Sequence, residues 1–198
     1  MKPYRTLQNF LPFALGAVAL VAIAGCSTTT GNHQPPPSAL CQLRDDNGNP
    51  IPATFTGTLG VTHQGHAANH VVEVQKAETA CCEGFDRVVF TFDGFHEPTY
   101  TVKYVHSPIQ QCGSGNSISV AGTAWLQISM KPAQAHTDAG QPTITDRNRH
   151  LACTNLKQLV VTCDFESDVE FVLGLSAKKP YRVVELQNPT RLVIDIKN

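Results

Sequence analysis

A chain of 198 residues with a formal net charge of −1 is long enough for one domain of ordinary size preceded by an export segment. Loss of Lys2 and Arg5 with that segment leaves thirteen basic and sixteen acidic residues, a formal charge of −3. This weakly acidic balance argues against a nucleic-acid partner, which needs a basic surface to displace counterions, and against polybasic attachment to a membrane.

Residues 1–25 have the parts of a bacterial lipoprotein signal peptide. Lys2 and Arg5 give a positively charged N-terminal region. The 14 uncharged residues 11–24 form an apolar run that we expect to be helical and that is shorter than a membrane-spanning helix. Small residues then precede Cys26, which resembles the lipobox, where a cysteine thiol receives a diacylglycerol thioether. We therefore expect an exported, acylated protein, carrying chains such as palmitate on Cys26 and facing the periplasm or cell exterior. The alternative is an ordinary secretory signal with a coincidental cysteine.

Residues 26–52 are predicted to contain the lipidated N-terminus, a tether and an irregular segment. Three consecutive prolines at 35–37 favour an extended, semi-rigid tether. The turn-rich stretch 45–50 (DDNGNP) follows Cys41, so we expect irregular structure stapled by that cysteine.

The six other cysteines predict a disulfide framework, because an even number of cysteines in an exported chain is typical of one. They are Cys41, Cys81, Cys82, Cys112, Cys153 and Cys163. Six cysteines can pair in fifteen ways, and Cys153 with Cys163 is the easiest local pair. Adjacent Cys81 and Cys82 are expected to bond to different partners, for which Cys41 and Cys112 are natural candidates. A redox or metal-thiolate role is the alternative, but the chain has no C-x-x-C pair.

From residue 53 to 198 the sequence predicts one all-β domain, an antiparallel β-sandwich or partly open barrel of about eight to ten short strands. Alternating apolar residues and turn signals place strands at 55–61, 71–74, 87–93, 100–104, 117–120 and 124–130. They also predict a strand pair, 159–165 with 169–175 across residues 166–168, and a hairpin over 181–196.

Three details of this arrangement can be tested. Leu126, Ile128 and Met130 fall at period two and should share one face of a strand. The runs 87–93 and 100–104 are expected to form a hairpin across the Asp93-Gly94 turn signal. The strand ending at Ile196 is expected to close the sheet, and Asn188-Pro189 to form the turn before it. Residues 132–150 are predicted to be a long polar loop.

Several segments occur in an order that resembles the AMIN-like domain of exported bacterial proteins, a relative of the AMIN domain. They are residues 85–90 (FDRVVF), 100–105 (YTVKYV), 113–115 (GSG), 120–126 (VAGTAWL), 172–175 (VLGL), 180–183 (PYRV) and 191–196 (RLVIDI). The resemblance covers roughly residues 71–196. It implies a β-sandwich and a cell-envelope module that binds peptidoglycan or an envelope protein.

A histidine cluster offers a rival function, that of a periplasmic metal-binding protein. His63, His66 and His70 have the spacing H-x-x-H-x-x-x-H, which would place three imidazoles on one helix face, a set that suits Zn²⁺ or Cu²⁺. Gly65 and strand-like flanks instead favour a polar, histidine-rich loop. We expect a protein without a cofactor.

Catalytic signatures are weak. The chain has no G-x-S-x-G and no H-E-x-x-H motif, and we expect a non-catalytic protein. Trp125, the only tryptophan, is expected to pack in the core, although an outward-facing ring would be able to stack on a sugar.

Overall fold

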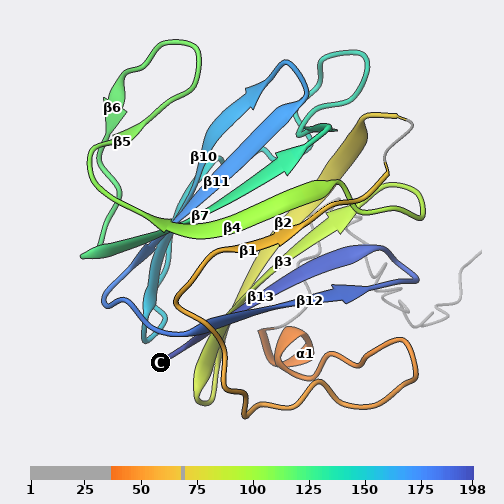
Figure 1. Ribbon diagram of the computed structural model, residues 1–198, viewed down its shortest axis with the longest axis vertical. Coiled ribbons are helices and arrows are strands. Elements are labelled where there is room, and N and C mark those ends of the chain that lie inside the picture. Colours follow the sequence, from red (N-terminus) through yellow and green to blue (C-terminus); the bar gives the residue numbers. More distant parts are fainter. Residues whose placement is uncertain (1–36, 68–69) are drawn as a thin grey trace, which may run out of the picture. The chain divides into compact units, whose positions relative to one another are not determined.

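The computed structural model describes residues 37–67 and 70–198, and these contain one short helix, α1 (Pro37–Cys41), and thirteen strands (Figure 1). The signal peptide and Cys26 predictions lie outside the described residues. Within the described ranges, no helix is long and apolar enough to cross a membrane.

Two main sheets and one small strand pair make up the fold. The large sheet has six strands in the order β1 (Thr62–Gln64), β4 (Thr99–Val105), β7 (Ala124–Lys131), β11 (Asp168–Leu175), β10 (Leu156–Phe165) and β9 (Asn148–His150). The small sheet has five in the order β12 (Tyr181–Leu186), β13 (Arg191–Lys197), β3 (Phe85–Phe92), β2 (Val72–Cys82) and β8 (Ala133–Gln134). A separate pair is formed by β5 (Ile109–Gln110) and β6 (Ser117–Ile118).

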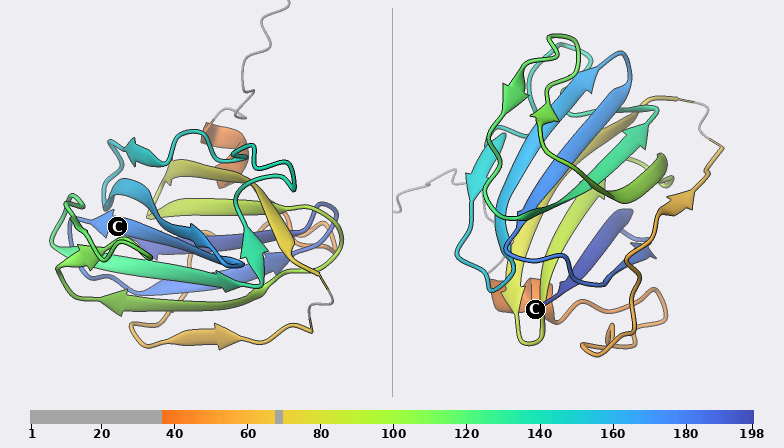
Figure 2. Two further views of the ribbon diagram at one scale, coloured as in Figure 1. Left: turned by 90° about the horizontal axis from the view of Figure 1, so that it is seen from above. Right: turned by 60° about the vertical axis from the view of Figure 1, so that its left-hand side comes forward.

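The predicted antiparallel β-sandwich is confirmed. Every strand pair is antiparallel except β2 with β8, and the two main sheets share one apolar core (Figure 2). The predicted face of Leu126, Ile128 and Met130 points into this core and is fully buried. Phe171 from the large sheet meets Phe90 from the small sheet with their ring centroids 4.6 Å apart. The sandwich therefore follows from period-two burial on both sheets.

The two local hairpins are also confirmed. β10 pairs with β11, and β12 pairs with β13. Glu166 and Ser167 both have positive φ, which gives the first turn the twist that a two-residue hairpin needs. Asn188 has positive φ in the second turn, before a cis bond to Pro189.

Three strand predictions are wrong. Residues 55–61 contain only an isolated bridge, Thr58 to Tyr181, and the first strand begins at Thr62. β3 and β4 do not pair: their connection carries the chain from the small sheet to the large one. β13 does not close its sheet, because it lies between β12 and β3. In the last two cases local alternation identifies apolar faces but does not say which strand pairs with which.

The outer face of the small sheet, which we call the closed face, is covered by the N-terminal segment 37–55. Leu40 and Ile51 pack against Phe85, Val89 and Val193 on this face. As a result, β3 and β13 are buried on both sides, although alternation alone would expose one side of each.

A buried ion pair holds the middle of the closed face. Asp195 lies opposite Arg87 on β3 and opposite Arg182 on β12. The carboxylate accepts hydrogen bonds from Arg87 Nε at 2.6 Å, Arg87 Nη2 at 2.9 Å and Arg182 Nε at 2.8 Å. Arg87 Nη1 donates to the Leu40 carbonyl at 2.7 Å, so the same guanidinium also holds the N-terminal segment.

Three disulfides join segments that are distant in sequence: Cys41–Cys82, Cys81–Cys153 and Cys112–Cys163. Cys81 and Cys82 thus have different partners. Cys41 is one of these partners, as expected, but Cys112 is not: it bonds to Cys163. The predicted Cys153–Cys163 bond is also wrong. Most of the chain between these two cysteines is extended in β10, where each residue advances by about 3.3 Å. A disulfide requires Cα atoms within about 7 Å, so the two cannot meet.

Candidate binding groove

An arm formed by residues 106–120, with β5 and β6, lies beside the outer face of the large sheet (Figure 2). Ile109 and Val120 from the arm pack on Val160 and Val172 of that face. Trp125 is half-buried in the same cluster, and its Nε1 donates to the Val120 carbonyl at 3.1 Å. Trp125 therefore packs in an apolar cluster, but this cluster lies under the arm and not between the two main sheets.

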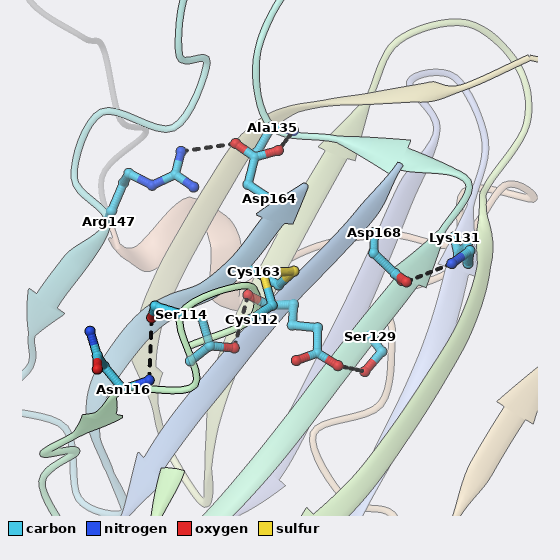
Figure 3. The surroundings of a disulfide bond; sticks show 12 residues. Cys112, Ser114, Asn116, Ser129, Lys131, Ala135, Arg147, Cys163, Asp164 and Asp168 are labelled. Atoms are coloured by element: carbon cyan, nitrogen blue, oxygen red, sulfur yellow. Dashed lines mark hydrogen bonds and ion pairs between the residues drawn. A yellow bond between two sulfur atoms is a disulfide. The ribbon is translucent and has the colours of Figure 1, made fainter. Parts of the chain in front are cut away.

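The tip of the arm is fixed to β10. The Cys112–Cys163 disulfide joins them, and the Cys112 N–H donates to the Thr162 carbonyl at 3.1 Å (Figure 3). Within the tip, the Asn116 N–H donates to Ser114 Oγ at 3.2 Å. A covalent bond, backbone hydrogen bonds and an apolar cluster thus hold a loop that local turn chemistry alone would leave free.

A groove of about 310 Å³ separates the arm from the sheet. The residues that line it come from the arm and from four strands: Val105, His106, Pro108, Ile109, Gln110, Gln111, Cys112, Gln127, Thr162, Glu170 and Val172. The groove is lined by three glutamine amides, one hydroxyl, one imidazole and one carboxylate, together with apolar side chains. Such a mixture of orienting polar groups and apolar surface is typical of ligand sites.

The groove floor has unused hydrogen-bonding capacity. Ser129 Oγ donates to Glu170 Oε1 at 2.9 Å, which orients that carboxylate. Within the described residues, the Gln127 side chain has no hydrogen-bond partner. A free amide can both donate and accept, so this part of the face suits a neutral polar ligand.

Charges near the far end of β10 are already paired. Asp164 accepts hydrogen bonds from the Ala135 N–H at 2.9 Å, Arg147 Nη1 at 3.0 Å and His136 Nδ1 at 3.0 Å (Figure 3). Burial by itself raises the pKa of Asp164, but these donors outweigh it and hold the pKa below its usual value. Asp164 therefore anchors segment 132–150 and is not part of the groove. The sequence predicts a loop for this segment, but it also contributes the short strands β8 and β9 to the two main sheets.

The three predicted histidine ligands are not assembled. His63 lies on β1 and its Nδ1 is 2.9 Å from Thr101 Oγ1. His70 is exposed, and His66 instead lies near two carboxylates, Glu97 and Glu185. The spacing would bring three imidazoles together only on a helix, and Thr62–Gln64 is a strand.

Sequence reasoning did not single out the groove residues. The available signal was the polar half of the β7 alternation, where Gln127 and Ser129 lie opposite the buried Leu126 and Ile128. It marks an outward face, but the arm that makes this face into a groove is held by a distant disulfide.

One of the three comparisons with known proteins found a match. Residues 69–198, more than half of the chain, match the family model of the AMIN-like domain. Neither the search of curated proteins nor the search of solved structures returned a match. The matched region contains β2 to β13, and with them both main sheets' long strands, the arm and the groove. The chain therefore belongs to the AMIN-like domain family.

Proposed function

We propose that this protein is a non-catalytic, lipid-anchored module of the bacterial cell envelope that binds peptidoglycan in the groove beside the arm. Its membership of the AMIN-like family supports an envelope-binding role. The observation that carries the proposal is the groove itself, which the Cys112–Cys163 disulfide holds open beside the sheet and whose floor carries the Gln127 amide, without a partner among the described residues.

The chemistry of the groove fits a glycan strand with short peptides. Peptidoglycan presents hydroxyl and amide groups, which Gln110, Gln111 and Gln127 can meet as donors and acceptors. Val105 and Pro108 offer apolar surface to the C–H faces of sugar rings. An envelope protein with exposed amides is the alternative occupant.

Attachment to the membrane would come from acylation of Cys26, with residues 27–36 as the tether. Stable anchoring takes more than one acyl chain, which lipoprotein processing supplies. Labelling of cells with radioactive palmitate should mark the wild-type protein and the Ser27→Ala variant, but not Cys26→Ser. Equal labelling of all three would refute the anchor.

Co-sedimentation with purified sacculi tests the binding role. The oxidised chain that starts at Ser27 should enter the pellet and be released by soluble muropeptides. A Gln110→Ala, Gln127→Ala double variant should lose this retention, whereas Gln75→Ala, an exposed glutamine on β2, should keep it. A wild-type chain left wholly in the supernatant would exclude peptidoglycan as the ligand.

A further inference from the structure

A second constellation lies away from the groove, where three segments meet. His66 follows β1, Glu97 lies in the β3–β4 connection and Glu185 lies on β12. Each offers one ligand atom, and the three atoms lie within 4.8 Å of one another. His66 Nε2 lies 3.0 Å from Glu185 Oε1.

The charges in this cluster do not balance. Glu97 is only 4% exposed, and the side chain of Glu185 is 33% exposed. Within residues 37–67 and 70–198, neither carboxylate forms an ion pair with a lysine or arginine. Buried carboxylates are otherwise paired or bound to metal ions, because desolvation of an unpaired charge is costly. Burial raises the pKa of Glu97, and the charge of Glu185 raises it further.

A second layer of hydrogen bonds orients the possible ligands. Tyr100 Oη donates to Glu185 Oε1 at 2.8 Å, and Gln187 Nε2 donates to Glu97 Oε1 at 2.6 Å. The backbone of His66 is held on both sides by Thr99, whose Oγ1 accepts from the His66 N–H at 3.0 Å and donates to the His66 carbonyl at 3.1 Å. Metal ligands in proteins commonly have such supporting partners.

We propose that His66, Glu97 and Glu185 bind one Zn²⁺ ion. One imidazole nitrogen and two carboxylate oxygens are accepted zinc ligands, and a water molecule would complete a tetrahedron. The ion would neutralise the two carboxylates and join the segment after β1, the β3–β4 connection and β12. This site shares only His66 with the histidine cluster predicted from sequence, and it does not depend on the function of the groove.

Zinc titration of the full chain, freed of metal with EDTA and with its disulfides intact, tests the site. Calorimetry should show one Zn²⁺ per chain, and the melting temperature should rise because the ion binds only the folded state. Glu97→Gln and Glu185→Gln should each weaken binding at least tenfold. Tyr100→Phe, which removes only a supporting hydroxyl, should weaken it by about tenfold. His63→Ala is the matched control and should bind as the wild type does.

A measurement on the wild type avoids any doubt about the folding of the variants. In histidine-selective NMR spectra, Zn²⁺ should shift the imidazole signals of His66 and leave those of His63 in place. The proposal would be overturned by the absence of saturable uptake, by shifts at His63 instead of His66, or by folded Glu97→Gln and Glu185→Gln variants that bind like the wild type. If no saturable zinc uptake occurs, a proton shared between the Glu97 and Glu185 carboxylates would explain why they lie close together.

Discussion

The two outer faces of this sandwich are covered in different ways. On the closed face, segment 37–55 lies directly on the small sheet, and the buried charges of Arg87 and Asp195 on that sheet pair with each other. On the large sheet, the arm makes contact through a small apolar cluster and one disulfide, and it leaves a polar groove.

This difference separates polar residues that stabilise the fold from polar residues that can serve a ligand. Arg87 and Asp195 are fully buried and their donors and acceptors are satisfied within the chain. Gln127 is half-buried, and its amide has no partner among the described residues. A buried polar side chain whose hydrogen bonds are all made within the protein indicates a structural role. A partly exposed polar side chain with unused hydrogen-bonding groups indicates a binding role.

The largest expected effect comes from breaking the closed face at Asp195. An Asp195→Asn substitution keeps the shape of the side chain but leaves the fully buried Arg87 guanidinium without its counter-charge. Removal of one partner of a buried ion pair costs about 3–5 kcal/mol of unfolding free energy. Urea denaturation measures the loss, and a cost below about 1 kcal/mol would show that the pair is not a main support of this face.

Removal of single disulfides sharpens the contrast between the faces. The Cys41–Cys82 bond spans 41 residues and the Cys112–Cys163 bond spans 51, so alanine pairs at either site should cost a similar 2–4 kcal/mol, roughly. Only the second pair releases the arm. Sacculus binding should therefore fall in the Cys112→Ala, Cys163→Ala variant and persist in folded Cys41→Ala, Cys82→Ala protein. The reverse pattern would place the binding site on the closed face.

A pH-dependent effect is expected at Asp164, which lies near the C-terminal end of β10 in the large sheet. Its lowered pKa means that the folded state favours the carboxylate, so its contribution is present above the usual value of 3.8 and is lost as the pH falls through the lowered folded value. Asp164→Asn should cost about 1–3 kcal/mol at pH 7, because the Ala135 N–H and Arg147 lose a charged acceptor. Thermal unfolding from pH 7 to pH 3 should show the gap between wild type and variant closing; a constant gap would contradict the assignment.

The smallest effect is expected at the exposed Lys131–Asp168 pair, which joins the end of β7 to the start of β11 in the middle of the large sheet. Its atoms are 2.6 Å apart, but 63% of the lysine side chain and 38% of the aspartate side chain are exposed. Water and salt screen such a pair, so Asp168→Asn should leave the melting temperature almost unchanged. A loss comparable with that of Asp195→Asn would mean that burial does not decide the value of these charges.

Local sequence patterns were sufficient for much of the fold. Alternation placed Leu126, Ile128 and Met130 in the core, and turn signals identified the hairpins around Ser167 and Asn188. These features depend on residues close in sequence, where strand period and turn chemistry act directly.

Features made by distant residues could not be predicted in this way. The β3–β4 connection carries the chain from the small sheet to the large sheet. Both sheets contain alternating apolar strands, so the local sequence does not distinguish which sheet β4 joins. The partner of Cys163 is Cys112, 51 residues away. Likewise His66 meets Glu185 across 119 residues, which no local histidine spacing reveals.

The central claim is that the groove beside the arm binds peptidoglycan. It is tested most directly by amide NMR spectra of the oxidised chain during titration with soluble muropeptides. We expect saturable shifts at residues 106–112, at Gln127 and along 162–172, with no change on the closed face at residues 85–89 and 191–195. Shifts confined to the closed face, or none at muropeptide concentrations that release the chain from sacculi, would contradict the account.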